Sequence, residues 1–173
     1  EKTAFNPVSP YAASKHYAFE ITKIYRESYG MFCSNGILFN HESPRRGETF
    51  VTQKIISGLK KIKKGNLKEL LLGNLDAKRD WGHAKDYVNA MWLINTKKKP
   101  SDYIIGSGYL NSVEDSVKKA FKHVGLNYKK YLIIDKKLIR KGESKARLAD
   151  PAKIRRVLKW KRKFTFDRLV TDM

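Results

Sequence analysis

The chain has 173 residues, a formal net charge of +20 and 41% hydrophobic residues, which is enough apolar material for one sizeable core. It contains no apolar run near the ~20 residues that a membrane span requires, and it begins with no signal-peptide pattern. The single cysteine, Cys33, excludes an internal disulfide, and the four scattered histidines offer no metal-ligand spacing. We therefore expect a globular cytoplasmic domain with no membrane association and no bound metal.

The first predicted helix begins at Pro10 and ends before Gly30, with Ser9 as its N-cap. Tyr11 and Lys15 are four positions apart and share one face of this helix. A neighbouring cation favours the phenolate form of a tyrosine, so Tyr11 can act as a general acid or base toward a substrate hydroxyl. The same spacing also occurs by chance on exposed helices, so the pair alone does not establish a catalytic site.

An apolar run predicts a strand from Phe32 to Phe39. In an open sheet of parallel strands a ligand binds beyond the carboxyl ends, so Asn40 and His41 are candidate site residues. The pattern then predicts a helix at 49–63, a strand at 69–72, a helix at 85–94 and a strand at 103–105. This alternation of helices and strands indicates an α/β fold with a doubly wound parallel sheet.

The last third of the chain carries clear helix boundaries. Ser112 and Asp115 form a capping-box pattern for a helix that stops at Gly125. A strand is expected at 131–134, Asp150 is expected to cap a helix with Pro151 at its first position, and Thr165 is expected to open the last helix.

The lysines raise the question of nucleic-acid binding. They cluster at Lys60, Lys61, Lys63 and Lys64, at Lys97 to Lys99, at Lys129 and Lys130, and at Lys136 and Lys137. A phosphate-binding surface is basic in this way, but these clusters lack interleaved aromatic residues and match no nucleic-acid motif. We interpret them as a solvated surface with no specific nucleic-acid partner.

Two sequence blocks point to a known family. Residues 40–47 read Asn-His-Glu-Ser-Pro-Arg-Arg-Gly, and residues 79–81 read Arg-Asp-Trp. Together with Tyr11-x-x-x-Lys15 they resemble the GDP-mannose 4,6-dehydratase family of extended short-chain dehydrogenases/reductases, which belong to the NAD-dependent epimerase/dehydratases. The resemblance covers essentially the whole chain and is strongest over residues 1–95. It implies a C-terminal portion, because the glycine-rich phosphate loop and the catalytic Thr and Glu of the family lie upstream of the position matching Glu1.

The family resemblance also implies a domain organisation. The chain would supply the C-terminal part of a doubly wound Rossmann-type parallel sheet and a smaller α/β substrate-binding domain. Residues 1–48 would belong to the Rossmann domain and residues 49–173 mostly to the substrate-binding domain, with residues 76–108 returning to the Rossmann domain.

The activity implied by the resemblance is that of a lyase that uses NADP. GDP-mannose would be converted to GDP-4-keto-6-deoxymannose and water, as in GDP-fucose or GDP-rhamnose synthesis, by a homo-oligomer that is a dimer or a tetramer. The isolated chain would be inactive because part of the site is upstream. Two alternatives stay open: a dehydratase acting on another GDP sugar such as a GDP-heptose, and an inactive truncated remnant.

The resemblance assigns site residues position by position. Tyr11 and Lys15 would be catalytic, and Lys15, His41 and Arg46 would bind NADP, although a backbone-satisfied His41 is the ordinary alternative. The residues implied to bind GDP-mannose are Asn40, Val51, Lys54, Arg79, Arg140 and Glu143. The loop assignment is the least regular, because Lys141 and Ser144 depart from the usual Pro and Val, and an ordinary ion pair between Arg140 and Glu143 remains open. Trp81 is expected in the core.

Overall fold

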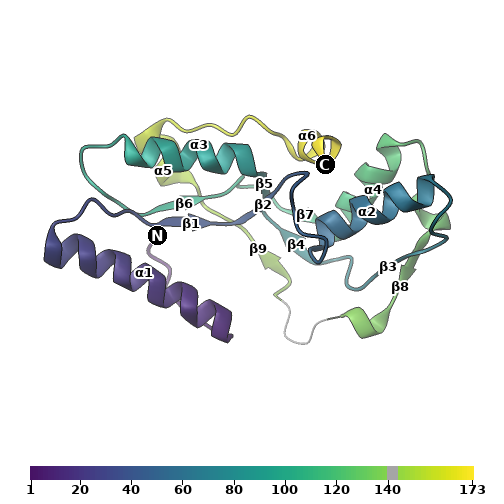
Figure 1. Cartoon of the computed structure of the whole chain (residues 1–173), viewed down its shortest axis with the longest axis horizontal. Coiled ribbons are helices and arrows are strands. Elements are labelled where there is room, and N and C mark those ends of the chain that lie inside the picture. Colours follow the sequence, from purple (N-terminus) through teal and green to yellow (C-terminus); the bar gives the residue numbers. More distant parts are fainter. Residues whose placement is uncertain (140–143) are drawn as a thin grey trace.

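The computed structural model describes residues 1–139 and 144–173 and shows an elongated mixed α/β molecule (Figure 1). One group of helices and strands lies at each end, and short strands connect the two groups in the middle. Within the described residues, no helix has both the length and the apolar character needed to cross a membrane.

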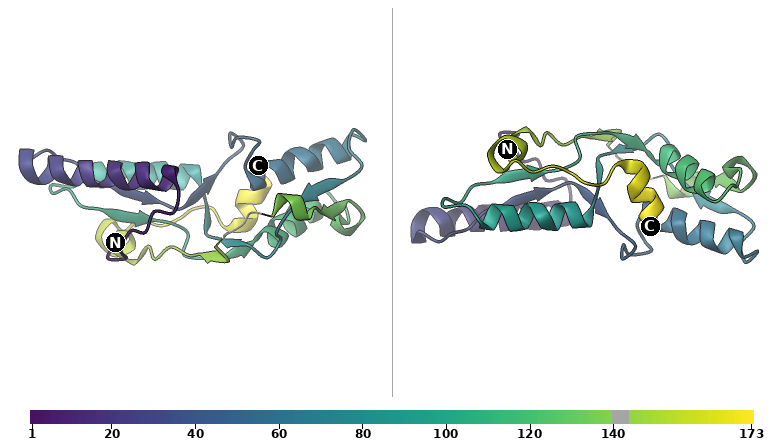
Figure 2. Two further views of the ribbon diagram at one scale, coloured as in Figure 1. Left: turned by 90° about the horizontal axis from the view of Figure 1, so that it is seen from below. Right: turned by 90° about the horizontal axis from the view of Figure 1, so that it is seen from above.

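The first end is built on two parallel strands, β1 (Gly36–Leu38) and β6 (Tyr103–Ile105), with Ile37 opposite Ile104. Three helices accompany them: α1 (Pro10–Tyr29), α3 (Ala84–Asn95) and α5 (Ala152–Leu158). Figure 2 shows α1 and α3 on one side of this strand pair and α5 on the other. The buried core of this end consists of Tyr87, Ala90, Ile94, Tyr103, Ile105, Ile154, Leu158 and Trp160.

The second end contains α2 (Val51–Lys63), α4 (Val113–His123) and the parallel strands β3 (Leu70–Leu72) and β8 (Leu132–Ile134). The short helix α6 (Phe166–Asp172) packs against α4, and two 3₁₀ turns, η1 (Tyr128–Lys130) and η2 (Lys136–Leu138), flank β8. Helix α2 contributes a stripe at helical spacing to the core of this end, namely Ile55, Ile56, Leu59 and Ile62.

Short strands join the two ends. Strand β2 (Asn40–Glu42) is parallel to β5 (Trp81–His83), with Glu42 opposite His83. Strand β4 (Lys78–Arg79) lies between β7 (Asn111–Ser112), which is antiparallel to it, and β9 (Ala146–Arg147), which is parallel. Trp81 is buried in the second core, as expected from the sequence.

The caps predicted from the sequence are confirmed for three helices. Ser9 Oγ accepts a hydrogen bond from Ala12 N at the start of α1, and Gly30 ends that helix in the left-handed conformation. Ser112 and Asp115 form the reciprocal capping box of α4. Thr165 caps α6.

Two boundary predictions need correction. The strand predicted for residues 32–39 is confined to β1, and Phe32 is exposed before it. The helix expected to begin at Pro151 begins at Ala152, and the Asp150 carboxylate accepts a hydrogen bond from Ala152 N. The apolar run predicted too long a strand, because only residues 36–38 pair with β6. Strand pairing depends on a partner that is distant in sequence, which the apolar run does not indicate.

Candidate functional site

Tyr11 and Lys15 lie close together at the start of α1. The Lys15 Nζ atom is 5.4 Å from the centroid of the Tyr11 ring, so the predicted juxtaposition of phenol and ammonium is present. Tyr11 is 72% exposed. Within residues 1–139 and 144–173, no described hydrogen bond, ion pair or ring contact connects this pair to His41 or Arg46. The Tyr11 side chain is therefore accessible to solvent, and the structure does not join the pair to His41 or Arg46 by a described contact.

Helix α1 is anchored near its other end. Arg26 donates two hydrogen bonds to the Asp102 carboxylate, at 2.7 and 2.9 Å, and Asn35 N donates a third at 2.9 Å. Burial raises the pKa of Asp102, but the bonds from Arg26 and Asn35 outweigh burial and leave the pKa below its ordinary value. Because α1 has no buried residue, this contact is a principal anchor of the helix that carries Tyr11.

Asn40 and His41 come after the carboxyl end of β1 and form the start of β2. The chain leaves its pairing with β6 at Phe39, whose N–H donates to the Ile105 carbonyl, and then pairs with β5 as β2. Both residues therefore follow the end of β1, as expected, but the sequence did not predict that they form a strand of their own. The reason is an exchange of strand partners within one extended segment, which the hydrophobic pattern does not reveal.

The His41 ring is held by two contacts. Its Nδ1 lies 2.9 Å from the Phe39 carbonyl oxygen, which can only accept, so Nδ1 carries the proton and a neutral ring presents Nε2 as an acceptor. The ring also lies 5.2 Å from that of Tyr87, whose hydroxyl donates to the Asn40 carbonyl at 3.3 Å. Burial, with nearby carboxylates, raises the pKa of the Tyr87 phenol.

Gly82 leaves room for the Tyr87 ring, because it has no side chain. It lies opposite His41 in the β2–β5 pair, and a Cβ atom at Gly82 would come within 2.3 Å of the Tyr87 ring. A side chain at residue 82 would therefore displace Tyr87 and the contacts that Tyr87 makes to Asn40 and His41.

Glu42 is not among the site residues predicted from the sequence, yet its side chain is buried, at only 1% exposed. Its Oε2 accepts a hydrogen bond from Thr52 Oγ1 at 2.6 Å and forms an ion pair with Arg46 Nε at 3.1 Å. The Arg46 guanidinium also lies over the Phe50 ring, 3.5 Å from its centroid. The available signal was the position of Glu42 in the Asn-His-Glu-Ser-Pro-Arg-Arg-Gly block, four residues before the arginine.

The remaining candidate substrate residues lie at the second end and in the middle. Val51 is the first residue of α2 and packs against the core of the second end, and Lys54 follows one turn later. Arg79, on β4, donates through Nη1 to the carbonyl oxygens of Lys78 and Ser144, at 2.8 and 2.9 Å. Arg140 and Glu143 lie outside the described residues.

Asp80 connects three segments at the Arg-Asp-Trp turn. Its fully buried carboxylate accepts hydrogen bonds from Ser107 N and Gly108 N, both at 2.7 Å, and from Ala149 N at 3.3 Å. A Cβ atom at Gly106 would lie 2.2 Å from the Ala149 Cβ, so glycine allows these backbones to approach. The turn is therefore a structural junction beside Arg79.

A cleft of about 560 Å³ opens between the first turn of α3 and the turn after β2. The buried His83 contributes to its wall; Nδ1 accepts from Lys85 N, so Nε2 donates to Asp172 at 2.8 Å. Arg45 and Lys85 also line the cleft. Among the described residues, no group of three or more His, Cys, Asp or Glu side chains could hold a metal ion.

Comparison with protein families gives a match along the whole chain. The family described as "GDP-mannose 4,6 dehydratase" matches residues 1–173. GDP-mannose 4,6 dehydratase 2 of Arabidopsis thaliana is 50% identical over 173 residues, which are 100% of this chain and 46% of that protein. GDP-mannose 4,6 dehydratase of Homo sapiens is 45% identical over 190 aligned residues, covering 100% of this chain and 51% of that protein. The chain spans about half the length of the curated relatives it matches.

Solved structures share the fold. RMD from Pseudomonas aeruginosa, complexed with NADPH, gives a TM-score of 0.92 at 20% identity, covering 99% of this chain and 57% of that one. A dTDP-glucose 4,6-dehydratase from Bacillus anthracis, in complex with NAD, gives a TM-score of 0.83 at 22% identity, covering 98% and 52%. At these identities the likeness establishes the mixed α/β fold.

Proposed function

Because the chain belongs to the GDP-mannose 4,6-dehydratase family, we propose that it supplies one half of a GDP-mannose 4,6-dehydratase. The proposed reaction is the NADP-dependent conversion of GDP-mannose to GDP-4-keto-6-deoxymannose and water. The observation that carries this proposal is the Tyr11–Lys15 juxtaposition on an anchored helix, within a chain that matches the family from end to end.

The residues near the start of the chain suit a nicotinamide dinucleotide. Lys15 provides a cation beside the Tyr11 ring, His41 directs Nδ1 to the Phe39 carbonyl and leaves Nε2 for a ligand, and the restrained Arg46 offers the planar donor geometry that phosphates fit. We propose that Lys15, His41 and Arg46 bind NADP, which when bound accepts hydride from the sugar and returns it.

Tyr11 is the proposed proton acceptor. As hydride leaves C4 of the hexose, the Tyr11 oxygen would take the proton of the C4 hydroxyl, with the Lys15 ammonium near the Tyr11 ring. The resulting ketone acidifies the C5 proton, so water can leave across C5 and C6. In this family that elimination uses a Glu and a Thr from the other half of the enzyme. Holding the reacting groups together can supply about 7–11 kcal/mol of the barrier.

The nucleotide sugar is proposed to bind along the middle of the molecule. Arg79 would hold the diphosphate, Lys54 would lie near the base, and Asn40 and Val51 would line the pocket. Arg140 and Glu143 are the proposed diphosphate and ribose contacts, and Ser144, which follows them, has its carbonyl within hydrogen-bond distance of Arg79.

The two buried cores support a division into two domains, for which we propose the bounds 1–48 and 76–108 for the Rossmann domain and mostly 49–173 for the substrate-binding domain. The cores differ from these bounds at two places: Ile154, Leu158 and Trp160 belong to the core at the first end, and Ala77 and Trp81 to the core at the second end. We further propose a cytoplasmic homo-oligomer, either a dimer or a tetramer.

The direct test uses a longer protein, hereafter the completed protein. In it, this chain is joined to the portion of a full-length relative that this chain does not cover. Incubated with NADP and GDP-mannose, it should form GDP-4-keto-6-deoxymannose, detectable by mass spectrometry as the loss of one water. UDP-glucose should give no product. Turnover of a GDP-heptose in place of GDP-mannose would identify the alternative sugar, and no turnover of any GDP sugar would identify an inactive remnant.

A further inference from the structure

Glu42 connects three consecutive segments through one carboxylate. It belongs to β2, its ion-pair partner Arg46 lies in the following turn, and its hydrogen-bond donor Thr52 lies in the first turn of α2. Arg46 N also donates to the Ser43 carbonyl, so the turn is closed by a backbone bond as well. The carboxylate thus lies at the centre of the loop between β2 and α2.

The contacts of Arg46 define how its guanidinium is presented. Glu42 occupies the Nε edge and Phe50 covers one face of the guanidinium, and 19% of the Arg46 side chain remains exposed. Nε is buried within ion-pair distance of Glu42 but makes no hydrogen bond of good geometry with a described residue, and one face is covered, while Nη1 and Nη2 are two donors that a bidentate phosphate contact can use. An arginine restrained in this way loses less side-chain freedom when it binds a ligand.

We propose that Glu42 is a positioning residue that sets the orientation of Arg46 for an anionic group of the bound dinucleotide. This inference rests on the proposed function, in which Arg46 contacts the cofactor. Thr52 also holds the Glu42 carboxylate in place, because its hydroxyl donates a hydrogen bond of 2.6 Å to the same Oε2 atom. Burying a carboxylate has a high desolvation cost, and the ion pair and the hydrogen bond offset it.

The distinguishing experiment is a double-mutant cycle in the completed protein. The variant Glu42→Gln keeps the volume and an acceptor for Thr52 but removes the charge that holds Arg46, so the Kd for NADP should rise about tenfold. Arg46→Ala should weaken NADP binding at least as much, and adding Glu42→Gln to it should cause no further loss. The matched control is Glu48→Gln, an exposed residue of the same turn that should leave Kd unchanged.

A separate measurement reports on Arg46 itself. In completed protein labelled with ¹⁵N-arginine, the Arg46 Nε–H, assigned by its loss in Arg46→Ala, should exchange with solvent more slowly in the wild type than in Glu42→Gln. Two results would overturn the positioning role of Glu42. One is an equal Nε–H exchange rate in the wild type and Glu42→Gln. The other is a loss of NADP affinity from Glu42→Gln that is the same whether residue 46 is Arg or Ala. A third outcome separates the two proposals. If Nε–H exchange is faster in Glu42→Gln but Arg46→Ala leaves the Kd for NADP unchanged, Glu42 restrains Arg46 but Arg46 does not bind the cofactor.

Discussion

Arg26 and Asp102 are joined by a bidentate contact across 76 residues of sequence, and this contact connects the helix of Tyr11 to the loop before β6. Asp102 Oδ1 also accepts the Asn35 backbone N–H, so the same carboxylate fixes the segment that leads into β1. The position of the candidate catalytic helix therefore depends on one carboxylate distant from Tyr11.

The first prediction concerns this anchor. Asp102→Asn in the completed protein should lower the free energy of unfolding by about 1.5–3 kcal/mol, the typical contribution of hydrogen bonds to a charged group. Because the pKa of Asp102 is lower in the folded state than its ordinary value, its contribution is present above about pH 4 and is lost as the pH falls through the folded pKa.

Thermal and denaturant unfolding at several pH values would measure this loss, with the exposed Asp76→Asn as the control. Amide exchange in α1 should accelerate in Asp102→Asn and stay unchanged in the control. A variant that unfolds like the wild type at neutral pH would contradict the anchor.

The second prediction follows from the burial of Glu42. Burial raises the pKa of the Glu42 carboxyl above its ordinary value, although Thr52 and Arg46 act in the opposite direction. A raised folded-state pKa means that the folded protein takes up this proton before the unfolded chain does. The wild type should therefore gain stability relative to Glu42→Gln as the pH falls through the raised pKa toward about 4.5. Denaturant unfolding of both proteins between pH 7 and pH 4 tests this, and a constant difference would refute it.

The third prediction concerns Tyr11 as general base. Tyr11→Phe in the completed protein should reduce kcat ~10²–10⁴-fold with little change in affinity for GDP-mannose, because the hydroxyl acts on the proton rather than in binding. The matched control is Tyr17→Phe, an exposed tyrosine on the same helix. Steady-state kinetics with calorimetric binding separates the two effects, and near-normal turnover of Tyr11→Phe would rule out the catalytic assignment.

The fourth prediction concerns the 173 residues alone. Among the described residues β1 pairs only with β6, and α1 has no buried residue although Tyr17, Ile24 and Tyr29 are exposed on it. Such an open edge and apolar surface favour association with other chains. We expect the isolated chain to aggregate, to bind no NADP and to form no 4-keto sugar. Light scattering and the product assay test this, and steady product formation by monodisperse chain would contradict it.

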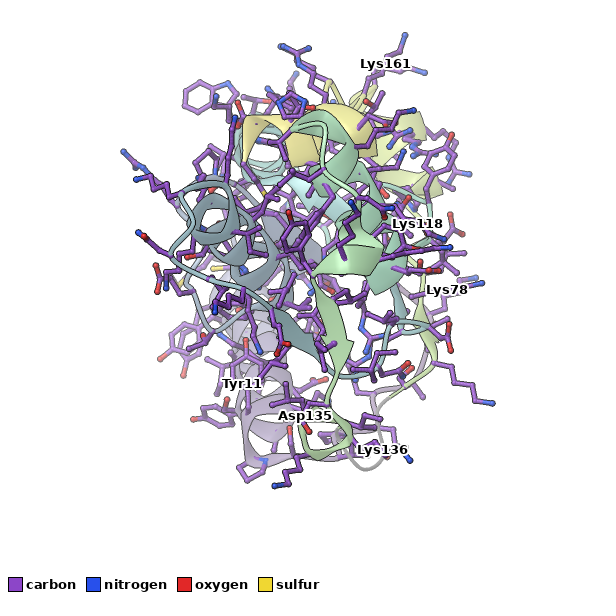
Figure 3. All side chains as sticks on the ribbon, turned by 90° about the vertical axis from the view of Figure 1, so that its right-hand side faces the viewer. Tyr11, Lys78, Lys118, Asp135, Lys136 and Lys161 are labelled. Atoms are coloured by element: carbon purple, nitrogen blue, oxygen red, sulfur yellow. The ribbon has the colours of Figure 1, made fainter. Side chains whose placement is uncertain are left out.

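The fifth prediction concerns the basic surface. In Figure 3 the labelled lysines Lys78, Lys118, Lys136 and Lys161 are spread along one edge of the view, from its top to its bottom, and belong to separate segments of the chain. Binding to DNA or RNA should therefore be weak, independent of sequence and lost between low and physiological salt. Fluorescence anisotropy at two salt concentrations measures this. A sequence-selective complex that survives physiological salt would require a defined binding surface instead.

The choice of nucleotide gives the sharpest check on the substrate residues. The difference between binding GDP-mannose and UDP-glucose depends on groups that the wrong base leaves unpaired, each costing about 1–3 kcal/mol. Equal affinities in the completed protein would remove the support for Lys54 as a base contact and would leave only the broader nucleotide-sugar family.

The sequence by itself determined the features that depend on neighbouring residues. The limits of α1 follow from Ser9, Pro10 and Gly30, and the start of α4 follows from Ser112 and Asp115, because a cap is satisfied within one helical turn. The Tyr11–Lys15 juxtaposition follows from helical spacing alone. The motifs also placed the chain in its family without any tertiary information.

Only the tertiary structure decided the features that depend on distant partners. The exchange from β6 to β5 at Phe39 placed Asn40 and His41 inside a strand, since pairing is set by backbone groups that sequence pattern does not identify. Burial of Glu42 became visible only when β2 and α2 were brought together, and the anchor of α1 only when Asp102 met Arg26. An Asp or Glu looks the same in the sequence whether water or a buried protein group forms hydrogen bonds with its carboxylate. The fold determines which of these two surrounds the carboxylate.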